Sequence, residues 1–444
     1  MDNARCTYIF AVMTFDADIV IAGGGLNGLS MALALRSAGF SVTLVDPTPQ
    51  KVRGNAKFDG RSYALAIASQ RVLSALGVWD HIQDPCPILG IKVTDGRAGE
   101  APSPLMLAFD HAEIEEGPMG FMVEDRKLRP ALLAAVKDAG VVQIDKDSVV
   151  GETATAKGTE ITLGSGKTLA ARLLIACDGK NSTIAKRAGI RRTGWAYGQT
   201  ALVCAIQHEK SHHGIAHQYF MPSGPLAILP LTGNRASIVW TESTERAEAI
   251  QAMADAEYLD ELRPRFGPFL GKISLAGDRF TYPLALSLAN SFVGDRLALV
   301  GDAAHVVHPI AGQGLNAGLK DVAALAEVLT DAHRRGEDVG RSDVLARYQS
   351  WRRFDTAALA VATDGFNRLF SNDNSLLRTI RDLWTDGEWG LSAIITAFTL
   401  IFPIGKYLAM AYIFLGRSEI WRARLLLWVK NLGQWSMGDV FVVA

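Results

Sequence analysis

The sequence predicts an α/β protein built on a Rossmann-type domain, with an inserted β-rich domain and helices towards the C-terminal end. Three observations carry this prediction. A buried strand at 17–22, a glycine turn, an apolar helix and a second strand at 41–46 form a βαβ unit, which implies a parallel sheet. Between 194 and 283 the pattern changes to strand-like stretches, which indicate an antiparallel sheet. Helical patterns then fill 316–381.

The composition is that of a globular protein with room for two or three domains. The chain has 444 residues, of which 49% are hydrophobic, so it is long enough to bury a sizeable core. Its formal net charge of −1 gives no electrostatic case for a nucleic-acid partner. The four cysteines (Cys6, Cys86, Cys177 and Cys204) are scattered without zinc-site spacing. This pattern favours reduced thiols in a cytoplasmic compartment, and we expect neither disulfides nor a metal site.

The two ends of the chain differ in character. The first fifteen residues lack a basic region and a long apolar core, so we expect no signal peptide, and Met13 is an alternative start. From 390 to 415 the only charged residue is Lys406, and a stretch of this length exceeds the roughly 20 residues that cross a bilayer. The segment that follows, 416–435, is basic and rich in tryptophan, which is typical of a membrane interface.

The stretch "GGGLNG" satisfies the dinucleotide-binding pattern GxGxxG. Gly23 permits the tight turn, Gly25 lets the backbone approach a diphosphate, and Gly28 allows close packing of helix on strand. The helix that follows directs free N–H groups at the phosphates. Asp46, at the end of the next strand, can accept hydrogen bonds from ribose hydroxyls. The motif alone leaves open whether FAD or NAD is bound.

A second glycine-rich stretch, "GSGKT" (164–168), resembles part of a P-loop. The full pattern needs a glycine where Ile161 stands and a helix afterwards, whereas the sequence continues as a strand. We therefore interpret it as a hairpin turn.

Two further motifs carry a family resemblance. In "CDGKNS" (177–182) the pair Asp178-Gly179 resembles the middle motif of flavoprotein aromatic hydroxylases, and "GDAAHVVHPIAGQGLN" (301–316) resembles their second FAD motif. The longer stretch "HPIAGQGLNAGLKD" resembles the signature of the UbiH/COQ group of ubiquinone-biosynthesis hydroxylases, which are class A flavoprotein monooxygenases. The resemblance extends over about residues 16–384.

The resemblance implies FAD as the cofactor and NAD(P)H as its reductant. In such a site Asp302 can accept hydrogen bonds from the ribityl chain. Glycines at 312 and 314 let backbone N–H groups approach the flavin ring, and the next helix places its positive end where charge accumulates on reduction. The residues expected to bind FAD are Gly23, Gly25, Gly28, Asp46, Arg61, Arg129, Asp178, Gly179, Gly301, Asp302, Pro309, Gly312, Gln313, Gly314 and Asn316.

Pro309 and His308 are the catalytic candidates. The resemblance implies that the carbonyl of Pro309 helps to hold the C4a-hydroperoxide of the flavin. His308 either supports the loop from behind or acts as an acid or base, and His305 is expected to tie the loop down by hydrogen bonding. Arg61 and Arg129 each have a plain alternative, a surface charge at a helix end for Arg61 and a salt bridge on a helix face for Arg129.

The expected FAD-binding domain comprises 16–89, 119–193 and 282–345, and the substrate domain comprises 90–118 and 194–281. A C-terminal helical region follows at 346–384, and a membrane-like tail at 385–444. Within the substrate domain, Phe220, Leu229 and Trp240 either line an apolar pocket or form ordinary core.

The chain departs from the family pattern in two places. The arginine that usually lies three residues after the serine of the middle motif is replaced by Ala185, followed by Lys186 and Arg187, which leaves open the basic residue that meets the nicotinamide cofactor. The tail resembles the paraquat-inducible protein A membrane family, through "FPIGKYL" and "WSMGDVF". A fusion and a misassembled reading frame are both compatible with such a tail.

The implied reaction is the O2-dependent hydroxylation of the aromatic ring of a polyprenylated phenol in ubiquinone biosynthesis, as in a 2-polyprenyl-6-methoxyphenol hydroxylase. It would proceed through a C4a-hydroperoxyflavin. A lipophilic substrate implies contact with a membrane surface, and we therefore expect a cytoplasmic protein that is peripheral to the inner membrane. The tail could insert into this membrane. Other ubiquinone-biosynthesis proteins would be further partners there. Two alternatives stay open: another FAD-dependent oxidoreductase of the same fold, and a non-enzymatic membrane protein that carries a decayed flavin domain.

Overall fold

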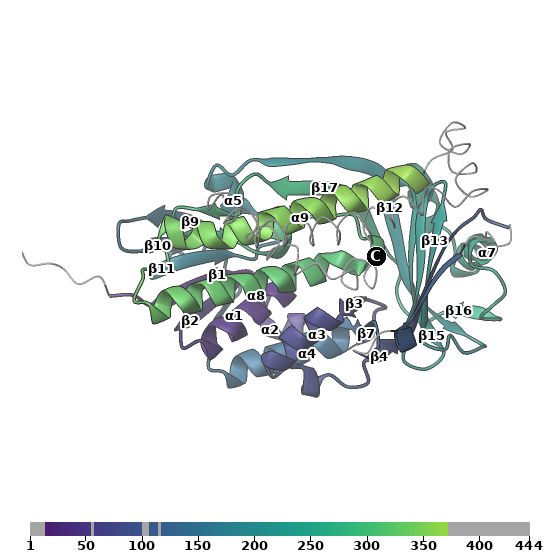
Figure 1. Ribbon diagram of the computed structural model, residues 1–444, viewed down its shortest axis with the longest axis horizontal. Helices are drawn as coiled ribbons and strands as arrows, with labels where there is room; N and C mark the ends of the chain where they lie inside the picture. Colours follow the sequence, from purple (N-terminus) through teal and green to yellow (C-terminus); the bar gives the residue numbers. More distant parts are fainter. Residues whose placement is uncertain (1–13, 55–56, 100–105, 114–116, 372–444) are drawn as a thin grey trace, which may run out of the picture.

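The structure is a computed structural model that describes residues 14–54, 57–99, 106–113 and 117–371 (Figure 1). The expected tail at 385–444 and the end of the expected helical region, 372–384, lie outside the described residues, as does Met13. Within the part of the chain that is described, no helix has both the length and the apolar composition that a membrane crossing requires.

The first layer is an eight-stranded sheet whose centre is parallel, as the βαβ pattern predicts. Its main path runs β18-β19-β11-β1-β2-β8. Off this path, β10 pairs with β11 and β9 pairs with β10, both antiparallel. Its strands are β1 (Ala17–Ala22), β2 (Val42–Asp46), β8 (Val142–Asp145), β9 (Val149–Ala154), β10 (Thr159–Leu163), β11 (Thr168–Ala176), β18 (Val293–Gly294) and β19 (Leu297–Leu299). The central strands are buried on both faces, which explains why they read as continuous apolar runs.

Helices cover this sheet and supply the rest of its core. They are α1 (Leu26–Ser37), α4 (Asp125–Asp138), α8 (Gln313–Arg334) and α9 (Ser342–Phe370), with the short α2 (Gln50–Arg53) and α5 (Thr183–Arg187) between strands. In α1, every residue from Leu29 to Leu35 is buried, so this helix is apolar on all sides rather than amphipathic.

The second layer is a nine-stranded sheet, in the order β20-β17-β12-β15-β14-β13-β5-β6, with β16 beside β12. Its strands are β5 (Gly90–Asp95), β6 (Met106–Asp110), β12 (Arg192–His208), β13 (Ile215–Met221), β14 (Gly224–Leu231), β15 (Arg235–Ser243), β16 (Ile273–Leu275), β17 (Phe280–Ala289) and β20 (His305–Val306). The helices α6 (Thr244–Gln251) and α7 (Asp255–Phe266) follow β15. Trp240 is fully buried in the core beneath this sheet.

A small three-stranded sheet, β3-β7-β4, lies between the two large ones (Figure 1). It consists of β3 (Ser62–Ala66), β4 (Cys86–Ile88) and β7 (Gly120–Glu124), and α3 (Ile67–Ala75) follows β3. The long helix α9 runs beside α8 and along β12 and β17, and so spans from the first sheet to the second (Figure 1).

The structure confirms the α/β class and the main elements, with two differences of detail. The second sheet is not purely antiparallel, because β13 pairs with β5 in parallel from Ile215 to Phe220. Strand β17 continues to Ala289 within this sheet, past position 282, where the sequence suggested a return to the first domain. The stretch 164–168 is a hairpin between β10 and β11, as interpreted, with Gly166 at φ +86°.

Candidate active site

The first glycine loop connects β1 to α1 in a conformation that only glycine allows. Gly23 has φ +105°, and a Cβ atom on Gly28 would lie 1.9 Å from the carbonyl oxygen of Gly23. Gly25 caps α1, and a Cβ there would meet no protein atom within 4 Å. The loop is therefore packed tightly on its inner side and open at Gly25, in front of the free N–H groups of α1.

Asp46 closes β2 and faces this loop. Its carboxylate accepts hydrogen bonds from the backbone N–H groups of Gly24 (2.5 Å) and Thr48 (2.7 Å), which leaves further acceptor positions on its two oxygens. Arg53 crosses the same place: it donates to the carbonyl of Gly24 at 3.0 Å and pairs with Asp145 at 2.7 Å. Asp46, the residue predicted to bind the ribose, is thus held beside the glycine loop by these backbone contacts and by the buried guanidinium of Arg53.

The middle motif lies directly after β11, where Cys177 bonds back to β1. Asp178 accepts hydrogen bonds from the backbone N–H groups of Thr183 and Ile184, so its carboxylate fixes the start of α5. Gly179 has φ +83°, with open space around it. Arg187, one of the basic residues after the motif, is held by Glu152 at 2.6 Å.

The second motif follows β19 on a turn with Gly301 at φ +63°. The backbone N–H of Gly301 donates to Asp321 of α8 at 2.9 Å, and His305 hydrogen-bonds the same carboxylate at 2.6 Å, which confirms the expected tie between His305 and the loop. Asp302 itself is solvent-exposed, yet the surrounding protein desolvates its carboxyl and raises the pKa of this group. Arg192 of β12 donates to the carbonyls of Asp302 and Ala303, so the turn is held from both domains.

The loop before α8 places its glycines as expected for a flat ligand. Gly312 is left-handed (φ +65°) and caps α8, and a Cβ on Gly314 would meet nothing within 4 Å. The carbonyl of Pro309 accepts from the N–H of Gly312 at 3.0 Å and retains a second lone pair. Gln313, the first residue of α8, is buried.

Asn316 is a clamp between this loop and the small sheet. Its side-chain oxygen accepts from the N–H of Ala66 and the hydroxyl of Ser69, and its amide donates to the carbonyls of Ala64 and Gly312. These four contacts use the hydrogen-bonding capacity of the amide. The geometry thus gives Asn316 a positioning role for the α8 N-terminus.

His308 points away from solvent and lies under α9. Its side chain is fully buried, and the ring of Tyr197 meets it edge to face with centroids 5.1 Å apart. Burial lowers the pKa of His308 to about 4, so the ring is neutral near pH 7.

The two arginines predicted near the cofactor gather around one buried carboxylate. Arg129 of α4 binds Asp125 through two nitrogens, at 3.1 and 2.7 Å, and the Tyr63 hydroxyl donates to the same acid at 2.8 Å. Arg61 pairs with Asp59 at 2.7 Å and lies 3.6 Å from Asp125. In this structure Arg129 therefore forms a salt bridge on the face of its helix, which is the alternative that the sequence left open.

These residues form a fitting cradle for FAD. The open glycines Gly25 and Gly314 lie at the N-terminal ends of two helices, α1 and α8, which pack on each other. Helix N-termini attract anions, and groups that gain negative charge, through unpaired N–H groups and the helix dipole. Asp302 offers an exposed carboxylate beside them. A dinucleotide can therefore lie with its diphosphate at Gly25 and its ring at Gly314 without displacing a side chain at either glycine.

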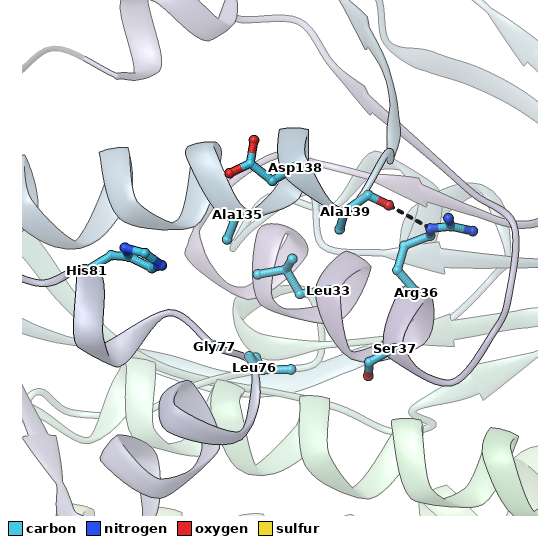
Figure 2. A pocket seen from close by; sticks show the side chains of 9 residues that line it. All are labelled: Leu33, Arg36, Ser37, Leu76, Gly77, His81, Ala135, Asp138 and Ala139. Carbon is cyan, nitrogen blue, oxygen red and sulfur yellow. Dashed lines mark hydrogen bonds between the residues drawn. The ribbon is translucent and has the colours of Figure 1, made fainter.

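A separate surface hollow of about 390 Å³ lies at the C-terminal end of α1, opposite the glycine loop (Figure 2). Its walls come from the C-terminal parts of α1, α3 and α4, and Arg36 donates there to the carbonyl of Ala139 at 3.1 Å. None of the residues predicted to bind FAD lines this hollow. It is not the site that the motifs describe.

Four residues of the site were missed by the sequence reasoning: Asn27, Arg192, Tyr197 and Asp321. Asp321 left a signal, because it is an acid on the apolar face of "LKDVAALAEVL". Asn27 lies inside the glycine motif, and its amide fills the space against Gly301 and Gly318. Arg192 and Tyr197 come from β12. This strand lies beside the flavin loops only in the folded protein, so no local sequence pattern indicates the two residues.

The comparisons with known proteins agree with this geometry. Residues 16–362 match the family model described as "FAD binding domain", and residues 367–444 match that of "Paraquat-inducible protein A". The ubiquinone hydroxylase UbiL of Rhodospirillum rubrum is 44% identical over 80% of this chain and 82% of its own length. The 3-demethoxyubiquinol 3-hydroxylase of Escherichia coli is 36% identical over 82% of this chain and 93% of its own.

Solved structures share the fold. PqsL of Pseudomonas aeruginosa, in complex with 2-aminobenzoylacetate, superposes with a TM-score of 0.68 at 21% identity, over 82% of this chain and 99% of the other. The p-nitrophenol 4-monooxygenase PnpA of Pseudomonas putida gives a TM-score of 0.67 at 19% identity, over 86% and 97% of the two chains. At such low identities the solved structures show only that the fold is shared. The relatives with 36–44% sequence identity show the family. The chain belongs to the FAD-dependent ubiquinone-biosynthesis hydroxylases, a family of flavoprotein monooxygenases.

Proposed function

We propose that the chain hydroxylates the aromatic ring of a polyprenylated phenol, with NAD(P)H as the reductant and O2 as the source of the oxygen atom. The observation that carries this proposal is the match to two relatives named as hydroxylases of ubiquinone or demethoxyubiquinol over at least 80% of each chain. Bound FAD would supply the redox chemistry and the activation of O2.

The residues of this chain would bind FAD and exclude water from it. Gly23, Gly25 and Gly28 would shape the diphosphate loop, and Asp46 would accept from the ribose. The turn of Gly301 and Asp302 would hold the ribityl chain. The loop that contains Gly312, Gln313 and Gly314 would face the ring, held in place by the Asn316 clamp.

Other predicted residues have a more indirect place in this proposal. Asp178 and Gly179 would form the turn beside the flavin, since the carboxylate of Asp178 is engaged with α5. Arg61 and Arg129 would support the wall of the site through Asp125. Pro309 would present its carbonyl to the reacting centre, with His308 behind it.

The proposed location is the cytoplasmic face of the inner membrane, reached as a peripheral protein. A polyprenyl tail partitions into lipid, so the enzyme must take its substrate from a membrane surface. The match of residues 367–444 to paraquat-inducible protein A adds a second link to a membrane, because the sequence from 390 to 415 is long and apolar enough to insert. Other ubiquinone-biosynthesis proteins are proposed partners there.

The reaction is tested by supplying the purified flavoprotein with NAD(P)H and a short-chain prenylphenol under ¹⁸O2. We expect NAD(P)H oxidation to accelerate with the phenol and the product to gain one labelled oxygen atom. Accelerated oxidation without oxygen incorporation would favour another FAD-dependent oxidoreductase, and protein that takes up no FAD would favour the decayed-domain alternative. Complementation of strains that each lack one ubiquinone ring hydroxylase, with the full chain and with a chain ending at 384, then identifies the ring position and tests the need for the tail.

A further inference from the structure

The outward face of α9 carries apolar side chains where a water-facing helix normally carries polar ones. Val361 is 73% exposed, the highest fraction among the large hydrophobic side chains that the structure describes, and Phe354 is 52% exposed. Ala358 and Gly365 lie in line with them, because positions three or four residues apart fall on one side of a helix. We call Phe354, Ala358, Val361 and Gly365 the α9 stripe.

The buried face of α9 has the opposite character. Four polar residues on this face are buried: Arg352, Thr356, Thr363 and Asn367. A surface helix of a globular protein usually turns its apolar side to the core and its polar side to water. Because α9 reverses this arrangement, its outward apolar residues are not explained by core packing, and they indicate a contact with an apolar partner outside the chain fold.

Cationic side chains flank the α9 stripe. Between 353 and 368 the exposed residues whose side chains are described are Arg353, Phe354, Ala357, Val361, Gly365 and Arg368, so both exposed charges are positive. The two carboxylates of this stretch are half-buried, and Asp355 pairs with Arg352 while Asp364 pairs with Arg368. An apolar strip between cations complements a lipid surface with anionic headgroups.

A tryptophan adjoins the C-terminal end of the α9 stripe. Trp195 of β12 is 41% exposed, and the guanidinium of Arg368 lies 5.0 Å from the centroid of its ring. Tryptophan and arginine are both suited to a membrane–water interface, because each combines an apolar body with a polar group. The position in the chain agrees with such an interface, since α9 ends at Phe370 and the apolar stretch of the sequence begins at 390.

The inner side of α9 lies against the Pro309 loop. Ala360 is buried in one cluster with Val307, two residues before Pro309, and with Leu286 of β17. In Figure 1, α9 runs along the near side of the molecule. One helix, about 10 Å across, therefore separates the α9 stripe from the loop that would face the flavin. A lipid surface at the stripe would lie close to the reaction centre.

We propose that the α9 stripe, together with Trp195, Arg353 and Arg368, is the surface by which this protein docks on an anionic lipid bilayer. The inference rests on the proposed membrane location and adds to it the face of the protein that meets the lipid. Phe354, Val361 and Trp195 would enter the interface, and the two guanidinium groups would contact lipid phosphates. Docking would hold the flavin domain in one orientation, with the loop before α8 next to the layer that contains the polyprenyl substrate.

The first test detects lipid contact on the flavin-loaded full chain. A polarity-sensitive fluorophore is attached at Val361→Cys or, as the matched control, at Val142→Cys, which is 57% exposed on β8, an edge strand of the first sheet. Both chains also carry Cys6→Ser, and the other three cysteines are buried or half-buried. On vesicles of phosphatidylcholine and phosphatidylglycerol, we expect the emission from position 361 to shift to the blue and to be quenched by brominated lipid chains, and that from position 142 to stay unchanged.

Two results of this measurement would overturn the docking surface. One is an unchanged emission from position 361 on protein that sediments with the vesicles. The other is a label at 361 that is already shielded before vesicles are added, because the tail or a second copy of the chain would then cover the α9 stripe.

The second test compares two substrates of the proposed reaction. Val361→Glu places a charge in the α9 stripe, and Val142→Glu is again the control. For a polyprenylphenol carried in anionic vesicles, we expect Val361→Glu to lower kcat/KM by about tenfold, because a carboxylate resists transfer into the apolar side of the interface. For a short, water-soluble phenol the rate should not change. Equal losses with both substrates, or no loss with the vesicle-bound one, would contradict docking through α9. If the unmodified chain inserts labelled oxygen into neither substrate, the proposed function fails, and the label at 361 still decides the docking surface.

Discussion

Asp321 shows how single buried residues hold this site together. Its carboxylate is wholly buried and accepts from the N–H of Gly301, from His305 at 2.6 Å and from Arg352 at 2.7 Å. Burial alone would raise the pKa of Asp321, but the charges of His305 and Arg352 lower it below its ordinary value. One side chain of α8 therefore fixes the turn that presents Asp302, although it does not face the open side of the site.

We expect Asp321→Asn to destabilise the protein by about 3–5 kcal/mol, because it removes the fully buried carboxylate that pairs with Arg352 and leaves this buried guanidinium only the less buried Asp355. The turn at Gly301 would also loosen, so FAD content should fall. Chemical denaturation and the flavin absorbance of the purified protein measure the two effects. The control is Asp343→Asn, whose carboxylate pairs with Arg341 at the surface, and a change of less than about 1 kcal/mol is expected there. Equal losses of unfolding free energy in both variants would contradict the conclusion that the buried carboxylate of Asp321 stabilises the protein more than a surface carboxylate does.

At the scale of elements, the N-terminal ends of α1 and α8 define where a ligand can lie. Both helices begin at glycine-rich loops, and both have one glycine at which a side chain would meet open space, Gly25 and Gly314. By contrast, a Cβ at Gly318, one turn further along α8, would collide with the amide of Asn27 at 2.4 Å. Gly25 and Gly314 therefore leave room for a ligand, whereas Gly318 allows close packing between helices.

Substitution of Gly314 separates these two functions of glycine. Gly314→Ala adds a methyl group in open space at a helical position, so the FAD-free protein should unfold at an unchanged or slightly higher temperature. FAD affinity should fall at least tenfold, because the methyl group would occupy the space against the ring. Titration of the FAD-free protein with FAD measures the affinity, and Gly365→Ala in α9, which also adds a methyl group in open space, is the control. An unchanged affinity would place the ring elsewhere.

At the scale of the whole molecule, the two large sheets are joined by side chains as well as by the chain. Arg192 at the start of β12 reaches the carbonyls of Asp302 and Ala303, and α9 runs from the first sheet to the second (Figure 1). Neutral histidines occur in both parts, one fully buried and one half-buried: desolvation lowers the pKa of His308 and of His217 to about 4. Stability should therefore depend on pH through both parts together.

We expect the free energy of unfolding to fall between about pH 6.5 and pH 4. A histidine with a lowered pKa stays neutral in the folded state while the unfolded chain takes up a proton, so its stabilising effect is complete above 6.5 and is lost as the pH falls towards 4. A shift of this size corresponds to roughly 3 kcal/mol for a fully buried group. Asp321 and Asp338, whose pKa values are lowered by their cationic partners against the effect of burial, act only below about pH 4.

Denaturant titrations at several pH values measure this dependence. His217→Phe keeps an aromatic ring between Tyr219 and Phe269 and removes one titrating group, so it should flatten the profile between pH 6.5 and 4. A profile that stays as steep as that of the unmodified chain would exclude His217 as a source of the slope.

The sequence by itself determined the α/β class, the flavin motifs and the family, because these depend on local patterns: short apolar runs that form buried strands, glycines at fixed spacing, and helix starts. It also placed the glycines, since a left-handed turn at Gly312 leaves few other choices. Only the tertiary structure decided which polar groups are already engaged. Asn316 and Asp178 carry motif positions, yet their side chains hold backbone groups of β3 and α5, and Arg129 is bound by Asp125. Tyr197 and His308 come from separate stretches of the chain, so their proximity depends on how β12 packs against the Pro309 loop, which no local pattern encodes.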